Sequence, residues 1–115
     1  MRDTSEHLRR IQSAITKIAG YVNEGRARFD KEEEVRISII RHLQTISEAA
    51  QAIPQDFRDH HSAIPWKQMI SFQDFLTFYY IEVDRDNLWN IAAHDIPNLK
   101  LKIDAIIIVE ASEEK

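Results

Sequence analysis

Residues 8–22 read LRRIQSAITKIAGYV, and this stretch decides the fold class. Its apolar residues recur at alternating intervals of three and four, which places them on one stripe of an α-helix. Polar side chains fill most of the other positions, so the stretch predicts an amphipathic helix from about Thr4 to Glu24. Gly25 follows and is a suitable place for that helix to stop. The stripe consists of Leu8, Ile11, Ile15, Ile18 and Val22.

Two further long helices are predicted in the middle of the chain. One is expected over residues 30–53, with Asp30 as its N-cap and the acidic run 32–34 near the positive end of the helix dipole. The other is expected over residues 65–80, opening on a proline, and it is apolar almost all round. The connector between them has room for one short helical turn at 55–60.

The last long helix is predicted to begin with Asp84 as its N-cap and to carry an apolar stripe as far as Ile106. Pro97 lies inside this pattern and lacks a backbone N–H, so we expect a kink about one turn upstream, near Ala93. Because the stripe continues past the proline, one kinked helix is expected rather than two. Residues 112–115 are expected to form a flexible tail.

Glycine and proline are scarce, with 2 Gly and 3 Pro among 115 residues. A β-sheet domain needs many tight turns that use these residues, so the composition excludes a sandwich or barrel. It also excludes the Gly-rich loops that bind phosphates. The length suits one domain, residues 1–115, since roughly 100–150 residues is the usual size. The prediction is an all-α, antiparallel up-and-down bundle of four long helices and one short helix.

Charge and cysteine content limit the chemistry further. Lys and Arg number 15 against 19 Asp and Glu, a net charge of −4, which argues against a dedicated nucleic-acid binder and predicts weak or absent RNA binding. The absence of Cys excludes disulfides and thiol nucleophiles. No apolar run approaches the ~20 residues of a membrane span, and the first ten residues lack an apolar signal region. We expect a cytoplasmic protein with no membrane partner.

Five histidines are the obvious candidates for acid–base or metal chemistry. Metal ligation on one helix would need HxxxH or HExxH spacing, and neither occurs, so no metal site and no cofactor is predicted. A weak surface metal site at the adjacent His60 and His61 is a minor alternative to an ordinary polar connector. His42 is expected to be partly buried, and His94 to face solvent beside Asp95. The five are His7, His42, His60, His61 and His94.

Charged and aromatic clusters have simpler structural explanations. The basic pairs at 9–10 and 26–28 have the charge to contact phosphates, but at this net charge they suit a mixed surface. The aromatic residues of 66–80 have faces on which bases could stack, but aromatics at helical spacing are far more often core or dimer interface.

Several short sequence motifs nevertheless resemble those of the HepT-like branch of the HEPN superfamily. They are ISEAA (46–50), IPW (64–66), VD (83–84), LW (88–89) and HDIPNLK (94–100), in that order. The resemblance extends over roughly residues 3–108 without an obvious gap.

The resemblance implies a small helical ribonuclease toxin, usually paired with a minimal nucleotidyltransferase antitoxin. Members are dimers with the active site in a cleft at the dimer interface, and they need no metal. Their catalytic motif is Arg-x4-His-x-Tyr, and it lies between the Pro-Trp pair that starts a helix and the Val-Asp pair. The arginine supplies positive charge to the scissile phosphate, and the histidine moves a proton. The tyrosine helps to position substrate and can be the acceptor of an AMP group.

This sequence departs from that motif at both the arginine and the histidine position. Alignment on IPW and VD puts Gln73 at the arginine position and Phe78 at the histidine position, with Asp74 in place of the usual asparagine. Tyr80 falls on the tyrosine, which leaves it as a potential AMP acceptor or substrate contact, or as an ordinary interface aromatic. Glutamine supplies no charge and phenylalanine transfers no proton. The motif is therefore degenerate, and no intact catalytic residue is predicted.

Two functions follow from this reading. The favoured one is a catalytically inactive HepT-like protein that keeps the dimer, and the nucleotidyltransferase partner with it, as a binding or scaffold subunit. The alternative is an active, metal-independent ribonuclease toxin with a relocated general base, for instance His42 or His94. A deliberate silencing substitution of the two motif positions is a third, weaker explanation.

Overall fold

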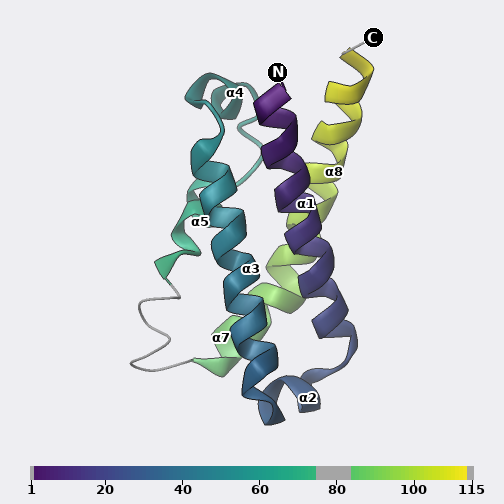
Figure 1. Cartoon of the computed structure of the whole chain (residues 1–115), viewed down its shortest axis with the longest axis vertical. Coiled ribbons are helices and arrows are strands. Elements are labelled where there is room, and N and C mark those ends of the chain that lie inside the picture. The colour runs from purple at the N-terminus through teal and green to yellow at the C-terminus, as the bar shows by residue number, and fades with distance from the viewer. Residues whose placement is uncertain (1, 75–83, 114–115) are drawn as a thin grey trace.

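The computed structural model describes residues 2–74 and 84–113, and the regular elements among them are all helical (Figure 1). Three helices are long: α1 (Arg2–Asn23), α3 (Glu33–Ala52) and α8 (Ile96–Glu113). α1 packs between α3 and α8 and runs antiparallel to both (Figure 1). The predicted all-α bundle is confirmed. The shorter elements are α2 (Arg26–Lys31), α4 (Gln55–His60), α5 (Trp66–Ser71), α7 (Arg85–Asn90) and the π-helical turn η1 (Ile91–Asp95).

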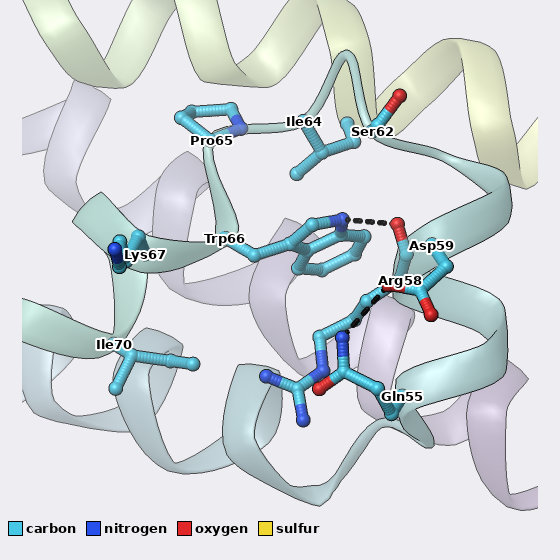
Figure 2. A pocket seen from close by; sticks show the side chains of 9 residues that line it. All are labelled: Gln55, Arg58, Asp59, Ser62, Ile64, Pro65, Trp66, Lys67 and Ile70. Carbon is cyan, nitrogen blue, oxygen red and sulfur yellow. Dashed lines mark hydrogen bonds between the residues drawn. The ribbon is translucent and has the colours of Figure 1, made fainter.

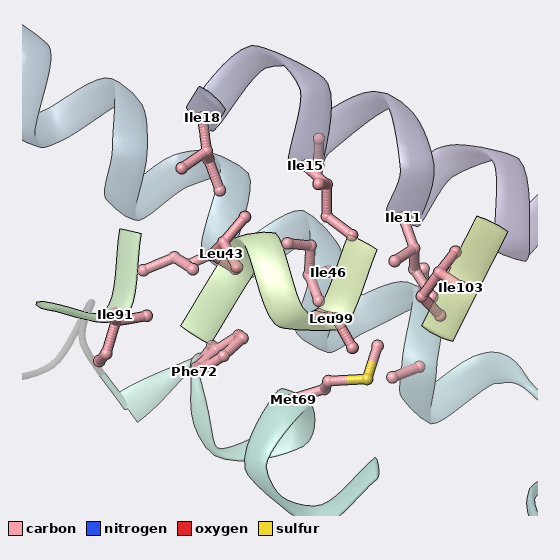
Figure 3. Packing of buried hydrophobic residues seen from close by; sticks show 14 of the residues in the cluster. Ile11, Ile15, Ile18, Leu43, Ile46, Met69, Phe72, Ile91, Leu99 and Ile103 are labelled. Carbon is pink, nitrogen blue, oxygen red and sulfur yellow. The ribbon is translucent and has the colours of Figure 1, made fainter. Parts of the chain in front are cut away.

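One hydrophobic core joins these helices. The stripe predicted on α1 faces inward, and its first four residues are fully buried against α3 and α8. α5 closes the core from the other side of α3 with Met69, followed by Phe72 (Figure 3). Because the three long helices each contribute a stripe, the core runs along their length. Figure 3 labels Ile11, Ile15 and Ile18 of α1, Leu43 and Ile46 of α3, and Ile91, Leu99 and Ile103 of the C-terminal segment.

The stop after α1 is confirmed. α1 ends at Asn23, and Gly25 adopts φ +99°, a backbone conformation that residues with a side chain rarely adopt. The chain can therefore reverse between α1 and α2 within two residues.

The predicted start of the second long helix is wrong. Asp30 is not an N-cap, because it lies inside α2, where its carboxylate pairs with Arg26 at 3.1 Å. Glu32 has an extended backbone and separates α2 from α3. Arg36 is buried, and its Nη1 donates to the carbonyl oxygens of Phe29 (2.6 Å) and Asp30 (2.8 Å). These carbonyls at the end of α2 are satisfied by a side chain, so the helix can break there.

The third long helix is shorter in its described part than predicted. α5 covers Trp66–Ser71, and the next two amides bond three residues back, Phe72 N to Met69 O and Gln73 N to Ile70 O. Such bonds tighten the end of a helix. The predicted continuation over 75–80 lies outside the described residues. The short turn predicted at 55–60 is confirmed as α4.

The last helix behaves as predicted up to its tail. The Asp84 carboxylate caps it by accepting from the backbone N–H of Asn87 at 3.0 Å. α7, η1 and α8 follow one another without a break, and the π-helical turn lies just before Pro97. There the amide of Ile96 donates to the carbonyl of Ile91, five residues back. The distortion predicted near Ala93 is therefore a π-helical turn. α8 runs to Glu113 and takes in the first two residues of the predicted tail.

No helix within 2–74 or 84–113 combines the length and the apolar character needed to cross a membrane.

Candidate functional site

Two of the four motif positions lie in the described structure, directly after α5. Gln73 and Asp74 are both exposed. The Gln73 amide oxygen accepts a 2.7 Å hydrogen bond from Nε2 of Gln51 on α3. Phe78 and Tyr80 lie outside the described residues, so the structure does not test their predicted places.

A chain of polar contacts ties this segment to α3. Nε2 of Gln51 also donates to the hydroxyl of Ser47 at 3.2 Å, and that hydroxyl donates to the carbonyl of Ile70 at 2.6 Å. We call Ser47, Gln51 and Gln73 the α3–α5 polar set. Sequence reasoning did not assign Ser47 or Gln51 to the site, although their spacing of four puts them on one helix face. The polar set holds Gln73, the first of the four motif positions, against α3.

Ser47 has 0% exposure, so its hydroxyl has no water as an alternative partner. We predict that Ser47→Ala lowers the free energy of unfolding by about 0.5–1.5 kcal/mol, because the Ile70 carbonyl loses its 2.6 Å hydrogen bond and keeps only the longer one from the Gln73 amide at 3.4 Å. Urea unfolding followed by circular dichroism measures this. Thr45→Ala is the matched control: among the described residues, its hydroxyl donates to the Arg41 carbonyl of its own helix in a solvent-exposed hydrogen bond. If both variants are equally stable, the buried bond contributes nothing.

The α3–α5 polar set offers groups for hydrogen bonding but no group suited to general acid–base catalysis. A glutamine amide can donate or accept a hydrogen bond, but it stays neutral and cannot balance the charge that develops on a phosphate. Asp74 adds a carboxylate beside it. No histidine takes part in the hydrogen bonds of the polar set among the described residues. The arrangement suits positioning or recognition better than proton transfer.

The histidines are dispersed over the bundle. His60 is exposed, with Nδ1 2.8 Å from the carbonyl oxygen of Asp56, and the ring of His61 lies against Phe57 at 4.4 Å. His94 on η1 is exposed as predicted, and His7 on α1 is half-buried. Within the described ranges, no group of three or more His, Cys, Asp or Glu residues is placed to hold a metal ion.

His42 on α3 is half-buried, as predicted, and its ring stacks on Tyr21 of α1 at 6.3 Å. Burial lowers the pKa of His42 below its ordinary value of 6.5, and the nearby Lys17 lowers it further. The neutral imidazole is therefore the form that the fold prefers.

A pH dependence of stability follows from this pKa. When the pH falls below 6.5, His42 in the unfolded chain takes up a proton before His42 in the folded chain does. We predict that the free energy of unfolding falls as the pH is lowered through this window. Unfolding by urea at several pH values checks it, with His42→Gln as the variant that flattens the slope. A slope unchanged in that variant would assign the effect to another group.

A separate open hollow lies at the start of α5, with a volume of about 500 Å³ (Figure 2). The Trp66 indole stands at its centre, and its N–H donates to the carbonyls of Arg58 (3.2 Å) and His61 (3.0 Å). These bonds anchor the Pro-Trp helix start to the connector. Arg58 and Lys67 are the cations of the lining, which contains no histidine. The hollow therefore lacks a group that exchanges protons near neutral pH.

The fold and these sites define a class: a small helical bundle whose polar contact region lies between α3 and the end of α5. The sequence model of the "Ribonuclease HepT-like" family matches residues 11–106. The chain therefore belongs to the HepT-like ribonuclease family, as its resemblance implied. No solved structure gives a significant match.

Curated relatives agree with this assignment. A "Probable ribonuclease HepT" of Thermococcus cleftensis is 34% identical over 106 residues, which cover 91% of this chain and 96% of the relative. "Putative RNase MJ0125" of Methanocaldococcus jannaschii is 30% identical over 92% of both chains. "Putative RNase TTE0752" of Caldanaerobacter subterraneus is 29% identical over 89% of both. The similarity spans nearly the whole of each chain.

Proposed function

We propose that this chain is a HepT-like protein that has lost RNA cleavage and acts as a binding or scaffold subunit. The observation that carries the proposal is that Gln73 and Phe78 occupy the arginine and histidine positions of the family motif. Losing a general acid–base residue costs about 10²–10⁴ in rate. Losing a preorganised positive charge costs a comparable ~10²–10³. Either loss alone would make cleavage very slow.

The place of Gln73 supports the proposal. Its amide bonds to Gln51, so the side chain is engaged in the α3–α5 polar set. An amide held in this way serves to fix the segment after α5 against α3. The carboxylate of Asp74 follows, where a phosphate would meet repulsion rather than attraction.

We further propose that the protein is a cytoplasmic homodimer with a minimal nucleotidyltransferase as its partner, and that RNA binds weakly or not at all. The support is membership of the HepT-like family and the net charge of −4. Replacing a histidine by Phe78 favours an apolar contact where relatives would hold RNA. Tyr80 would then be an interface aromatic rather than an AMP acceptor.

A second candidate function is a ribonuclease with a relocated base. His94 is exposed, and its neighbour Asp95 accepts a 3.2 Å hydrogen bond from Gln68 of α5, which brings this part of η1 against the helix that leads to the motif. His42 is a poorer candidate because its ring is half-buried against Tyr21.

Induced expression in a bacterial host tests the proposed function. We expect the growth rate of the host to stay at that of an empty-vector culture, with the protein present in soluble form. Growth arrest that disappears in His94→Ala or His42→Ala, at equal protein level, would instead establish the relocated-base ribonuclease. Growth arrest that persists in both variants and disappears in Tyr80→Phe would show that the family active site is functional in this chain. It would overturn the proposal.

A further inference from the structure

The open hollow at the start of α5 has the size and the walls of a small-ligand site. Its volume of about 500 Å³ lies within the roughly 300–1,000 Å³ that such sites occupy. One wall is apolar and firmly held: Trp66 is 8% exposed and Ile64 3%, and the Trp66 N–H is bonded to two backbone carbonyls. Pro65 and Ile70 complete this wall (Figure 2). The hollow is therefore formed before any ligand enters it.

Two cations line the same hollow without ion pairs of their own. Arg58 of α4 is half-buried and Lys67 of α5 is exposed. Neither forms an ion pair with another residue of 2–74 or 84–113, whereas Arg26 and Arg28 each form two. The hollow therefore offers positive charge that the described part of the fold does not neutralise.

The Arg58 guanidinium gives the strongest indication of a ligand. Its Nε is buried, and within the described ranges it has no hydrogen-bond partner. Figure 2 shows the guanidinium beside the Trp66 ring, on the side of Gln55 and Ile70. Buried donors are nearly always paired, and a carboxylate matches the guanidinium with two parallel hydrogen bonds. A bound carboxylate would therefore supply an acceptor that the described chain does not.

The remaining polar lining limits the charge of that ligand. Asp59 adds one carboxylate, which accepts a 2.8 Å hydrogen bond from Nε2 of Gln55 (Figure 2). Two cations against one carboxylate leave a single net positive charge around the hollow. This charge suits a monoanion better than a phosphate ester, which carries about −1.5 to −2 at pH 7.

We propose that the hollow is a binding site for a small monocarboxylate with an apolar body. The carboxylate pairs with the guanidinium of Arg58, with Lys67 at the rim, and the body lies against Trp66, Pro65 and Ile70. The lining contains no histidine, so the site holds its ligand without proton transfer near neutral pH. The proposal does not depend on whether the protein cleaves RNA.

Two-dimensional NMR of the full chain, titrated with benzoate at pH 7, tests the proposal. The chain has two tryptophans, so it gives two indole N–H signals, which Trp89→Phe assigns. Trp89 packs on Phe29, away from the hollow, and serves as the internal reference. We expect benzoate to shift the Trp66 signal to saturation and to leave the Trp89 signal in place. Benzamide has the same shape without the charge, and inorganic phosphate has charge without the apolar body. Each should bind at least about tenfold more weakly.

Substitutions of the cations locate the site. Arg58→Gln is expected to weaken benzoate binding at least about tenfold, because it removes a hydrogen bond to a charged group. Arg41→Gln, at an exposed position of α3, removes the same charge elsewhere and should bind as the wild type does. If Arg58→Gln does not fold, Lys67→Gln at the exposed rim takes its place, with a smaller loss of about threefold expected. The proposal fails if benzoate gives no saturable shift of Trp66, if benzamide or phosphate binds as tightly as benzoate, or if neither cation matters.

Discussion

Gln73→Arg and Phe78→His together are expected to create the RNA cleavage that the wild type lacks under the proposed function. The double variant restores both the fixed charge and the proton-transfer group of the family motif, each of which contributes about 10²-fold or more. Gln73 is exposed, so an arginine fits there without disturbing the core. Each single variant should remain close to the wild type, because residues that act as a unit are not additive. The initial rate of cleavage of end-labelled tRNA measures the effect.

A control with the same charge change isolates the position. Gln68 is another exposed glutamine, on α5 itself, and Gln68→Arg with Phe78→His adds the same side chains with the arginine five residues away from position 73. We expect this variant to stay inactive. Equal cleavage by the two double variants would mean that added positive charge alone is responsible. Absence of cleavage in both double variants would mean that restoring the two motif positions is not enough for activity.

The largest loss of stability is expected for Phe29→Ala. Phe29 has 0% exposure, and its ring meets that of Trp89 edge to face, with centroids 5.1 Å apart. The Arg26 guanidinium lies 5.6 Å from the centroid of each ring. We predict a decrease in the free energy of unfolding of about 3–5 kcal/mol, the usual cost of removing a buried phenylalanine ring. Urea unfolding, with an unchanged m-value, is the measurement.

Phe57→Ala serves as the control for that loss. Phe57 on α4 is only half-buried, and its ring contacts His61 at the surface, so the same truncation there removes less contact area. A smaller decrease is expected than for Phe29→Ala. Equal decreases in the two variants would show that the junction of α2 with α7 and α3 contributes no more to stability than the exposed connector does.

The fold was largely predictable where a helix has one core-facing stripe. The stripe from Leu8 onward and the Asp84 cap rest on local spacing and a local hydrogen bond, and both are confirmed. The break at Glu32 was not predictable from the acidic run, because it depends on Arg36 reaching back to the carbonyls of Phe29 and Asp30. That contact exists only once α2 has folded onto α3.

The residues of the candidate site are a prediction from the sequence, whereas their contacts could not be predicted from it. Alignment on the family motifs assigned Gln73 and Asp74 to motif positions. The bond from Gln51 to Gln73 joins residues 22 apart in sequence, and no local pattern indicates it. The π-helical turn shows the intermediate case: Pro97 fixed where the distortion lies, while the form it takes depends on which carbonyl the Ile96 amide reaches.

The central claim is that this HepT-like protein does not cleave RNA by the family mechanism. The most direct measurement is incubation of the purified full chain with labelled tRNA and mRNA, beside His42→Ala, His94→Ala and Tyr80→Phe. We predict that the wild type cleaves no faster than a buffer control. Cleavage that survives both histidine variants and is lost in Tyr80→Phe would contradict the claim.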